Sequence, residues 1–164
     1  MACVAMNKKR AHGAYTLEGS NHMNIKGTGK NDSLHGQETN DVISGGKGND
    51  FLWGHGGDDI LTGGAGADVF VFSTGGGEDT ITDFDPANGD VIVFSYDTAL
   101  NAMFIGPLSD GMAWTSDTGG NCSVEAGDFN GDGRMDTEIY VNDVSVTILG
   151  WDPEHLTGQM LLGG

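Results

Sequence analysis

Aspartate recurs every nine residues in the first half of the chain, at Asp32, Asp41, Asp50, Asp59 and Asp68. A hydrophobic residue follows each aspartate two positions later, and a glycine stands five positions before it. Carboxylates and the backbone carbonyls of glycine-rich turns are the hard oxygen ligands that Ca²⁺ prefers. The spacing therefore predicts several calcium ions, held where the turns recur.

The charge of the chain agrees with cation binding. Twenty-four Asp and Glu against seven Lys and Arg give a net charge of −17, and no Lys or Arg lies between Gly48 and Gly133. Such a balance disfavours polyanionic partners, so we expect no nucleic-acid partner. A solvated acidic face is the alternative explanation, but it would not space its carboxylates at intervals of nine.

The same period predicts stacked units rather than an ordinary globular fold. With 29 glycines in 164 residues and 37% hydrophobic residues, the chain is folded and rich in turns. In GGKGNDFLW, residues 45–53, a glycine turn precedes a short strand that points Leu52 to one face and Phe51 and Trp53 to the other. Two periods make one coil of eighteen residues, so each turn stacks on the turn two periods later at roughly 4.8 Å.

GGKGNDFLW and GGAGADVFV resemble the nonapeptide GGxGxDxUx of the RTX, or haemolysin-type, calcium-binding proteins. The resemblance implies an all-β fold with a parallel β-roll, in which carbonyls at repeat positions one, two and four and the aspartate at position six hold calcium. In this chain the implied ligands are Gly45, Gly46, Gly48 and Asp50, then Gly54, His55, Gly57 and Asp59, then Gly63, Gly64, Gly66 and Asp68.

The earlier repeats depart from this pattern. They keep Asp32 and Asp41, which remain candidate ligands, but position four is Lys30 in one repeat and Thr39 in the other. Further upstream, Ile25 keeps the hydrophobic register while Met23 replaces the aspartate, which predicts a coil without metal that caps the roll.

The segment after the last repeat, GGGEDTITDFDPANGD, is similar to the one that follows the roll in serralysin-like metalloproteases. That resemblance implies Asp79 and Asp90 as ligands of the final calcium sites. Asp83 also matches the motif but need not touch metal. The family has a further carboxylate in the loop between the roll and DTITDF, which Gly75, Gly76 and Gly77 occupy in this chain, so one terminal site departs from the pattern.

Beyond residue 95 the pattern changes to short alternating strands. MAWTS, TEIYVN and VSVTILGW are predicted strands, and the last two, separated by Asp143, form a predicted hairpin. We therefore expect a small antiparallel, β-sandwich-like half joined to the roll. The expected organisation is a flexible segment over 1–18, the roll over 19–73 and the post-roll strands over 74–164.

The loop GDFNGDGRMDTE between two of these strands resembles an EF-hand loop. Asp128, Asn130, Asp132 and Asp136 occupy positions one, three, five and nine, and Gly133 stands at position six, where the sharp turn falls. The glutamate expected at position twelve is absent. A plain Asx-turn hairpin is the alternative, and we favour calcium.

The sequence also bears on export. No stretch approaches the ~20 apolar residues of a membrane span, and MACVAMNKKRAHG lacks the apolar core of a cleavable signal. RTX proteins commonly carry an uncleaved C-terminal signal read by type I secretion machinery, so the resemblance implies an extracellular protein and makes WDPEHLTGQMLLGG the candidate signal. Cys3 and Cys122 can be paired or free.

No HExxH or GxSxG motif is present. The histidines are scattered along the chain, at His12, His22, His35, His55 and His155. His35 and His55 are expected to be ordinary solvated side chains. The sequence thus favours a calcium-binding module that is not catalytic in itself. One alternative is the accessory domain of a larger secreted hydrolase or polysaccharide-modifying enzyme. Another is a calcium-dependent adhesin or matrix protein that binds polysaccharide, or itself, through Phe51 and Trp53, unless other segments of the chain cover these rings.

Overall fold

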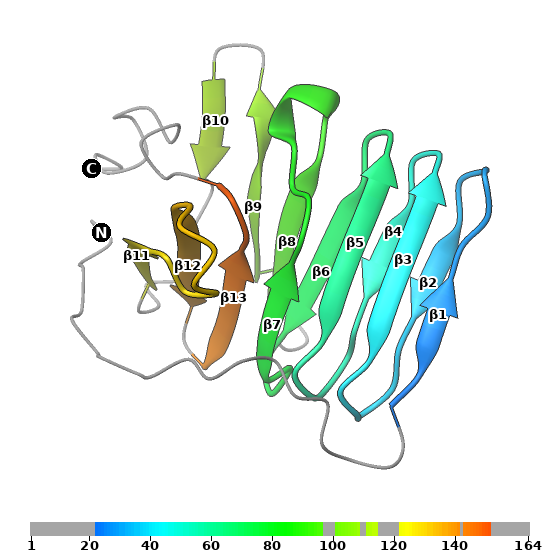
Figure 1. The fold of residues 1–164 in the computed structure, drawn as a ribbon, viewed down its shortest axis with the longest axis horizontal. Coiled ribbons are helices and arrows are strands. Elements are labelled where there is room, and N and C mark those ends of the chain that lie inside the picture. Colours follow the sequence, from blue (N-terminus) through cyan, green and yellow to red (C-terminus); the bar gives the residue numbers. More distant parts are fainter. Residues whose placement is uncertain (1–21, 97–100, 109–110, 115–121, 142, 152–164) are drawn as a thin grey trace.

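The computed structural model describes residues 22–96, 101–108, 111–114, 122–141 and 143–151. Within these ranges the chain forms thirteen strands and one short 3₁₀ turn, Pro86–Asn88, which confirms the predicted all-β class. The strands lie in two sheets (Figure 1).

The first sheet has seven strands, in the order β1 (Asn24–Lys26), β3 (Val42–Lys47), β5 (Ile60–Ala65), β7 (Glu78–Ile81), β13 (Val144–Ile148), β12 (Asp136–Val141) and β11 (Cys122–Gly127). The second has six, in the order β10 (Gly111–Trp114), β9 (Asn101–Leu108), β8 (Val91–Tyr96), β6 (Val69–Ser73), β4 (Phe51–Trp53) and β2 (Ser33–His35).

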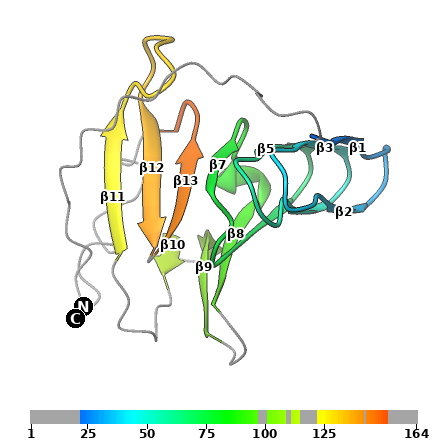
Figure 2. The ribbon, with the colours of Figure 1, turned by 90° about the horizontal axis from the view of Figure 1, so that it is seen from below.

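Strands β1 to β8 form the predicted parallel β-roll. Successive strands alternate between the two sheets, and each strand from β1 to β6 pairs in parallel with the strand two places later. Ile25 pairs with Ile43, and Leu34 with Leu52, a register shift of eighteen residues that confirms the predicted coil length. Figure 2 shows the roll from below, with the coils side by side across the view and β1 and β3 of one sheet facing β2 of the other.

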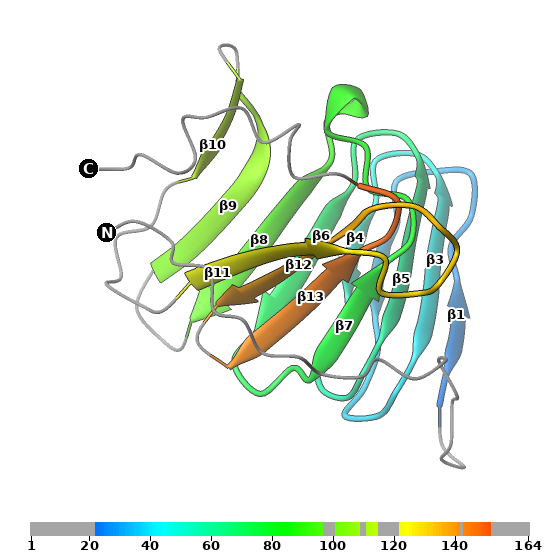
Figure 3. The same ribbon diagram turned by 60° about the vertical axis from the view of Figure 1, so that its left-hand side comes forward.

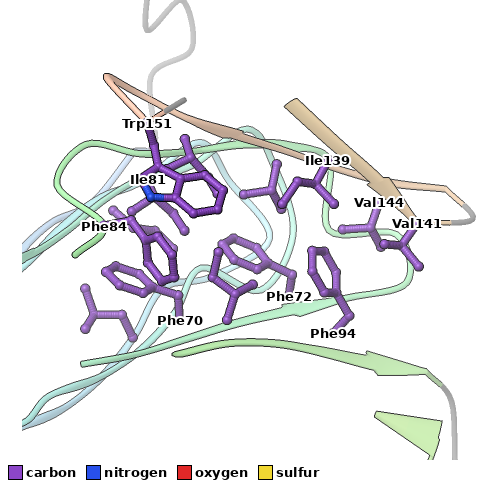
Figure 4. Close-up of a cluster of buried hydrophobic side chains, with 14 of the residues drawn as sticks. Phe70, Phe72, Ile81, Phe84, Phe94, Ile139, Val141, Val144 and Trp151 are labelled. Atoms are coloured by element: carbon purple, nitrogen blue, oxygen red, sulfur yellow. The ribbon is translucent and has the colours of Figure 1, made fainter. Parts of the chain in front are cut away.

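The core lies between the sheets and widens along the roll. Strands β2 and β4, with three residues each, send one side chain inward, and Leu52 is fully buried. Strands β6 and β8 have five and six residues, so Phe72 and Phe94 add a second inward row beside Phe70. Figure 4 shows these rings packed against side chains from the other sheet.

The antiparallel strands extend both sheets of the roll. Strand β13 pairs in parallel with β7 and leads to β12 and β11, while β9 and β10 continue the other sheet from β8 (Figure 3). The predicted hairpin is confirmed, since β12 and β13 pair antiparallel up to Val141 and Val144. The post-roll strands therefore form one continuous core with the roll, to which Ile139 and Val146 contribute fully buried side chains.

Two segments named from the sequence, residues 1–18 with Cys3 and the candidate export tail after Trp151, lie outside the described residues. Cys122 begins β11. No helix in the described part of the chain is long and apolar enough to cross a membrane.

Candidate metal sites

The repeated aspartates form two rows along the roll, because each Oδ1 atom accepts a hydrogen bond from a backbone N–H one coil earlier. In one row the N–H donors and Oδ1 acceptors are Asp32 and Asp50 (2.8 Å), Asp50 and Asp68 (2.8 Å), and Asp68 and Asp90 (2.9 Å). In the other they are Met23 and Asp41 (2.7 Å), Asp41 and Asp59 (2.7 Å), and Asp59 and Asp79 (3.0 Å). Asp79 and Asp90 thus end the two rows, and Met23 holds the place expected of the capping coil.

The second oxygen divides the aspartates into two classes. The Oδ2 atoms of Asp50, Asp59 and Asp68 are buried and have no hydrogen-bond partner. These three residues belong to the three complete repeats. A buried carboxylate oxygen without a partner is strongly disfavoured, and a bound cation would remove that penalty.

The two incomplete repeats satisfy the same oxygen with protein donors. Asp32 Oδ2 accepts hydrogen bonds from the N–H (2.6 Å) and the hydroxyl (2.8 Å) of Thr28, and these bonds lower the pKa of Asp32. Asp41 Oδ2 accepts the N–H of Gln37 (2.7 Å). Asp32 and Asp41 therefore have less need of a cation than the aspartates of the complete repeats.

The position-one glycines make room for this arrangement. A methyl group on Gly45, Gly54 or Gly63 would collide with the Oδ2 atom of the aspartate of the same repeat. A methyl group on Gly45 would also lie only 2.6 Å from the carbonyl oxygen of Gly63, one coil later. Carboxylate and carbonyl oxygens of stacked turns thus share a small space that only glycine leaves open, and that space suits a hard cation.

Positions two and four bring further carbonyls to the stacked turns. A methyl group on Gly64 or Gly66 would collide with the carbonyl oxygen of Gly46 or Gly48, so the oxygens of one coil face the turn of the next. Gly46 and Gly48 have φ angles of 109° and 115°, which favour glycine. His55 occupies position two of its repeat with φ 74°, in the same left-handed region.

The electrostatics of the rows also call for positive charge. Burial, joined by neighbouring carboxylate charges and opposed by backbone hydrogen bonds, raises the pKa of Asp59 to about 7 and that of Asp79 to about 8. The same causes raise the pKa of Asp90 to about 6 and shift that of Asp68 upward. Without a cation, the ionised form of these carboxylates is disfavoured in the fold.

Two structural devices in the turns were missed from the sequence. Repeat position five supplies side-chain oxygens that accept backbone N–H groups one coil later, as Asn31 does from Asn49 (2.9 Å) and Asn40 from Asp58 (3.0 Å). Asp83 accepts the N–H groups of Gly63 (2.9 Å) and Gly64 (2.8 Å). The recurrence of Asn directly before the aspartate could have indicated the hydrogen bonds made by position five.

The EF-hand-like loop satisfies its own side chains. Asp128 accepts the N–H groups of Gly131 (2.7 Å) and Gly133 (3.0 Å), and Asn130 and Asp132 each accept an N–H two residues ahead, as in Asx turns. Buried Asp136 accepts N–H groups from Phe129 (3.0 Å) and Asn130 (3.3 Å) at the start of the loop and from Gly150 (2.7 Å), which follows β13.

These bonds support the Asx-turn alternative, and calcium in this loop stays a prediction. Among the described residues, no three His, Cys, Asp or Glu side chains converge on a candidate metal position. Calcium in the roll would therefore depend on backbone carbonyls for most of its ligands.

The outward side chains of β4 behave as predicted, but two histidines make a contact that was not predicted. Leu52 is buried, while Phe51 and Trp53 are half-buried on the opposite face. His35 is exposed and His55 half-buried, as expected of solvated side chains, but the sequence did not predict their contact, in which Nδ1 of His35 and Nε2 of His55 lie 3.3 Å apart. The eighteen-residue length of the coil could have indicated this contact, because it places residue 35 beside residue 53.

Residues 24–52 and 35–70 match the family model of the RTX calcium-binding nonapeptide repeat, described as four copies. Residues 24–70 are RTX repeats. No curated protein sequence is significantly similar to the chain. Among solved structures, the chain is similar to the AlgE6R3 subunit of the Azotobacter vinelandii mannuronan C5-epimerase, with 24% identity, coverage of 88% of this chain and 82% of that chain, and a TM-score of 0.28.

The two classes of aspartate in the RTX repeats predict different responses to the same substitution. Asp50→Asn keeps an oxygen for the N–H of Asp32 but removes the charge beside the unpartnered position, so the chain should bind fewer calcium ions. Asp32→Asn is the matched control and should leave the number nearly unchanged. Equilibrium dialysis at millimolar calcium measures both variants, and an equal loss in the two would contradict the distinction.

For the EF-hand-like loop we predict that Asp128→Asn combined with Asp132→Asn also lowers the calcium count. Asparagine keeps the Asp132 oxygen that accepts the N–H of Arg134 and one of the two Asp128 oxygens that accept the N–H groups of Gly131 and Gly133, so the loop should retain most of its turn bonds while losing two charges. Because well-separated sites are usually independent, the RTX sites should remain filled. Calcium counts equal to wild type would assign the loop to the Asx-turn alternative.

Proposed function

We propose that the chain is a secreted RTX module that folds when it binds extracellular calcium and is not catalytic in itself. The supporting observation is the set of buried, unpartnered Oδ2 atoms of Asp50, Asp59 and Asp68. They occur only in the complete repeats, because protein donors satisfy the Oδ2 atoms of Asp32 and Asp41. Gly45, Gly54 and Gly63 would bring the nearest carbonyls, and a bound calcium ion would supply the positive charge that this cluster of oxygens lacks.

The balance of forces in the coils explains why folding should require the ion. Stacked carboxylates repel by about 1 kcal/mol per pair at ~5 Å in water and by more in a protein. Ordering each residue of a turn costs about 1–2 kcal/mol, whereas burying one side chain such as Leu52 contributes only ~1.5–3 kcal/mol. A divalent ion reverses the repulsion and joins two turns, so binding and folding become one equilibrium.

The dependence on calcium should be graded along the chain. Coils near β2 and β4 bury one side chain per strand, whereas β6, β8, β12 and β13 share a broad core. Phe72 and Ile139 belong to that core and are buried. The antiparallel half therefore has stabilising contacts that need no ion, and the first coils have few.

An extracellular setting fits this chemistry. Extracellular calcium modules commonly bind with dissociation constants of about 10⁻⁴–10⁻³ M, far above the calcium level of a cytosol. A chain with net charge −17 and ion-dependent coils would stay largely open before export and fold outside. Type I secretion through the C-terminal residues is the export route we propose.

The absence of a catalytic role is also part of the proposal. The carboxylates of the roll are engaged by backbone N–H groups in the two rows, an arrangement that suits ion binding rather than proton transfer to a substrate. Purified chain should hydrolyse neither protein nor ester substrates. Turnover that is abolished by a point mutation would contradict this.

Removal of calcium should unfold the repeats and spare the antiparallel half. In chelator at pH 8, amide exchange should lose protection over β1 to β5, while β12 and β13 keep part of theirs. Millimolar calcium should restore protection throughout and increase the strand signal in circular dichroism. Protection of residues 24–65 that is equal with and without calcium would show that the repeats fold without the ion.

A change of pH provides an internal control for that experiment. The pKa values of Asp59, Asp79 and Asp90 are raised in the fold, so the metal-free fold binds more protons than the unfolded chain between about pH 4 and pH 8. Its stability therefore falls as the pH rises through that window. In chelator, the roll should be more protected at pH 5 than at pH 8, and the opposite order would contradict the electrostatic explanation.

A further inference from the structure

The outer face of β2 and β4 carries a cluster of rings, His35, Phe51, Trp53 and His55. The ring of His55 stacks on Trp53 with centroids 4.0 Å apart and planes 18° from parallel. The ring of His35 lies 5.5 Å from that of His55 and 5.7 Å and 5.9 Å from those of Phe51 and Trp53. His35 is exposed and His55 is half-buried, so solvent reaches the pair.

The two imidazoles face each other through nitrogen atoms. Nδ1 of His35 lies 3.3 Å from Nε2 of His55. This separation is longer than the usual 2.7–3.2 Å of an N–H hydrogen bond. Two ligands of a tetrahedral zinc ion with Zn–N bonds of about 2.0–2.1 Å lie about 3.3–3.4 Å apart. Neighbouring ligands of a square-planar ion with similar bonds would lie only about 2.8–3.0 Å apart.

A neighbouring hydroxyl group sets the orientation of one ring. Ser33 Oγ lies 3.1 Å from Nε2 of His35. If Nε2–H donates to Ser33, the lone pair of His35 is on Nδ1, the atom that faces His55. Metal-binding histidines usually use the second ring nitrogen in this way, for a hydrogen bond that fixes tautomer and orientation.

The backbone of His55 points to a role for its side chain. His55 has φ 74°, at a repeat position where Gly46 and Gly64 have φ of 109° and 102°. A non-glycine residue in this region is disfavoured, and such positions are often retained for function. The strain places the ring of His55 against Trp53 and opposite His35, while its carbonyl remains available to the turn.

We propose that His35 Nδ1 and His55 Nε2 bind one zinc ion, or a similar borderline metal ion, in tetrahedral geometry. In the described part of the chain no third His, Cys, Asp or Glu joins them, so water or a group from a bound partner completes the coordination. The indole of Trp53 stabilises the positively charged, metal-bound imidazole on which it stacks. Nitrogen ligands separate this site from the oxygen-lined calcium positions, which take a hard ion.

The test uses the full chain with its calcium sites saturated by millimolar Ca²⁺, titrated with Zn²⁺ by calorimetry and with Co²⁺ by visible absorption. Wild type should bind one more zinc ion than His35→Ala or His55→Gly, and only wild type should show the intense absorption of tetrahedral cobalt. His55→Gly restores the glycine found at this position in two other repeats, so it should fold and bind calcium normally. His22→Ala, outside the cluster, should match wild type.

Ser33 distinguishes a positioned site from two exposed histidines. Ser33→Ala should weaken zinc binding about ten-fold by releasing the ring of His35, and Ser33→Thr, which keeps the hydroxyl, should restore it. Equal zinc stoichiometry in wild type, His35→Ala and His55→Gly would overturn the proposal and leave the two rings as a hydrogen-bonded pair. Octahedral-type cobalt absorption in wild type would also overturn it.

Discussion

The hydrogen bond from the backbone N–H at the aspartate position of one coil to the aspartate Oδ1 of the next coil sets the geometry on which the rest of the roll depends. It fixes the height of one coil on the next and turns every carboxylate toward the interior of the turn. In Asp50, Asp59 and Asp68, whose Oδ1 is engaged in this way, Oδ2 is buried. Thr28 and Gln37 satisfy Oδ2 in the first repeats, whereas the Oδ2 atoms of Asp50, Asp59 and Asp68 have no hydrogen-bond partner.

The core and the aspartate rows occupy different parts of each coil. Hydrophobic residues two positions after the aspartates meet between the sheets, and the carboxylates meet in the turns. Toward the end of the roll, longer strands and the rings of Phe70, Phe84 and Trp151 replace the single inward residue, with edge-to-face contacts at 6.3 Å and 5.6 Å. Apolar contacts therefore contribute more at one end of the molecule and electrostatic contacts more at the other.

The nine-residue period predicted the coil, the inward residues and the two classes of repeat, because a repeated unit has the same neighbours in every copy. The sequence was less informative about contacts between residues that lie far apart along the chain. The way β13 joins β7 brings together residues such as Val146 and Asp79, more than sixty positions apart, and no repeat encodes it. The contact between His35 and His55 was missed for a related reason. The two residues belong to different coils and lie on the outer face, where the repeat imposes no residue type.

The unequal width of the core has a consequence for the order in which the structure assembles. The antiparallel half and the last coils contain most of the apolar contacts, and each earlier coil touches only its neighbours, as in other solenoids. Forming a folding nucleus costs the least free energy where β8, β12 and β13 come together. Further coils then add to this nucleus one at a time. Coils are therefore added from the C-terminal part toward residue 24, opposite to the direction of synthesis. A nascent chain that lacks its last strands has no folded surface to which the first coil can be added.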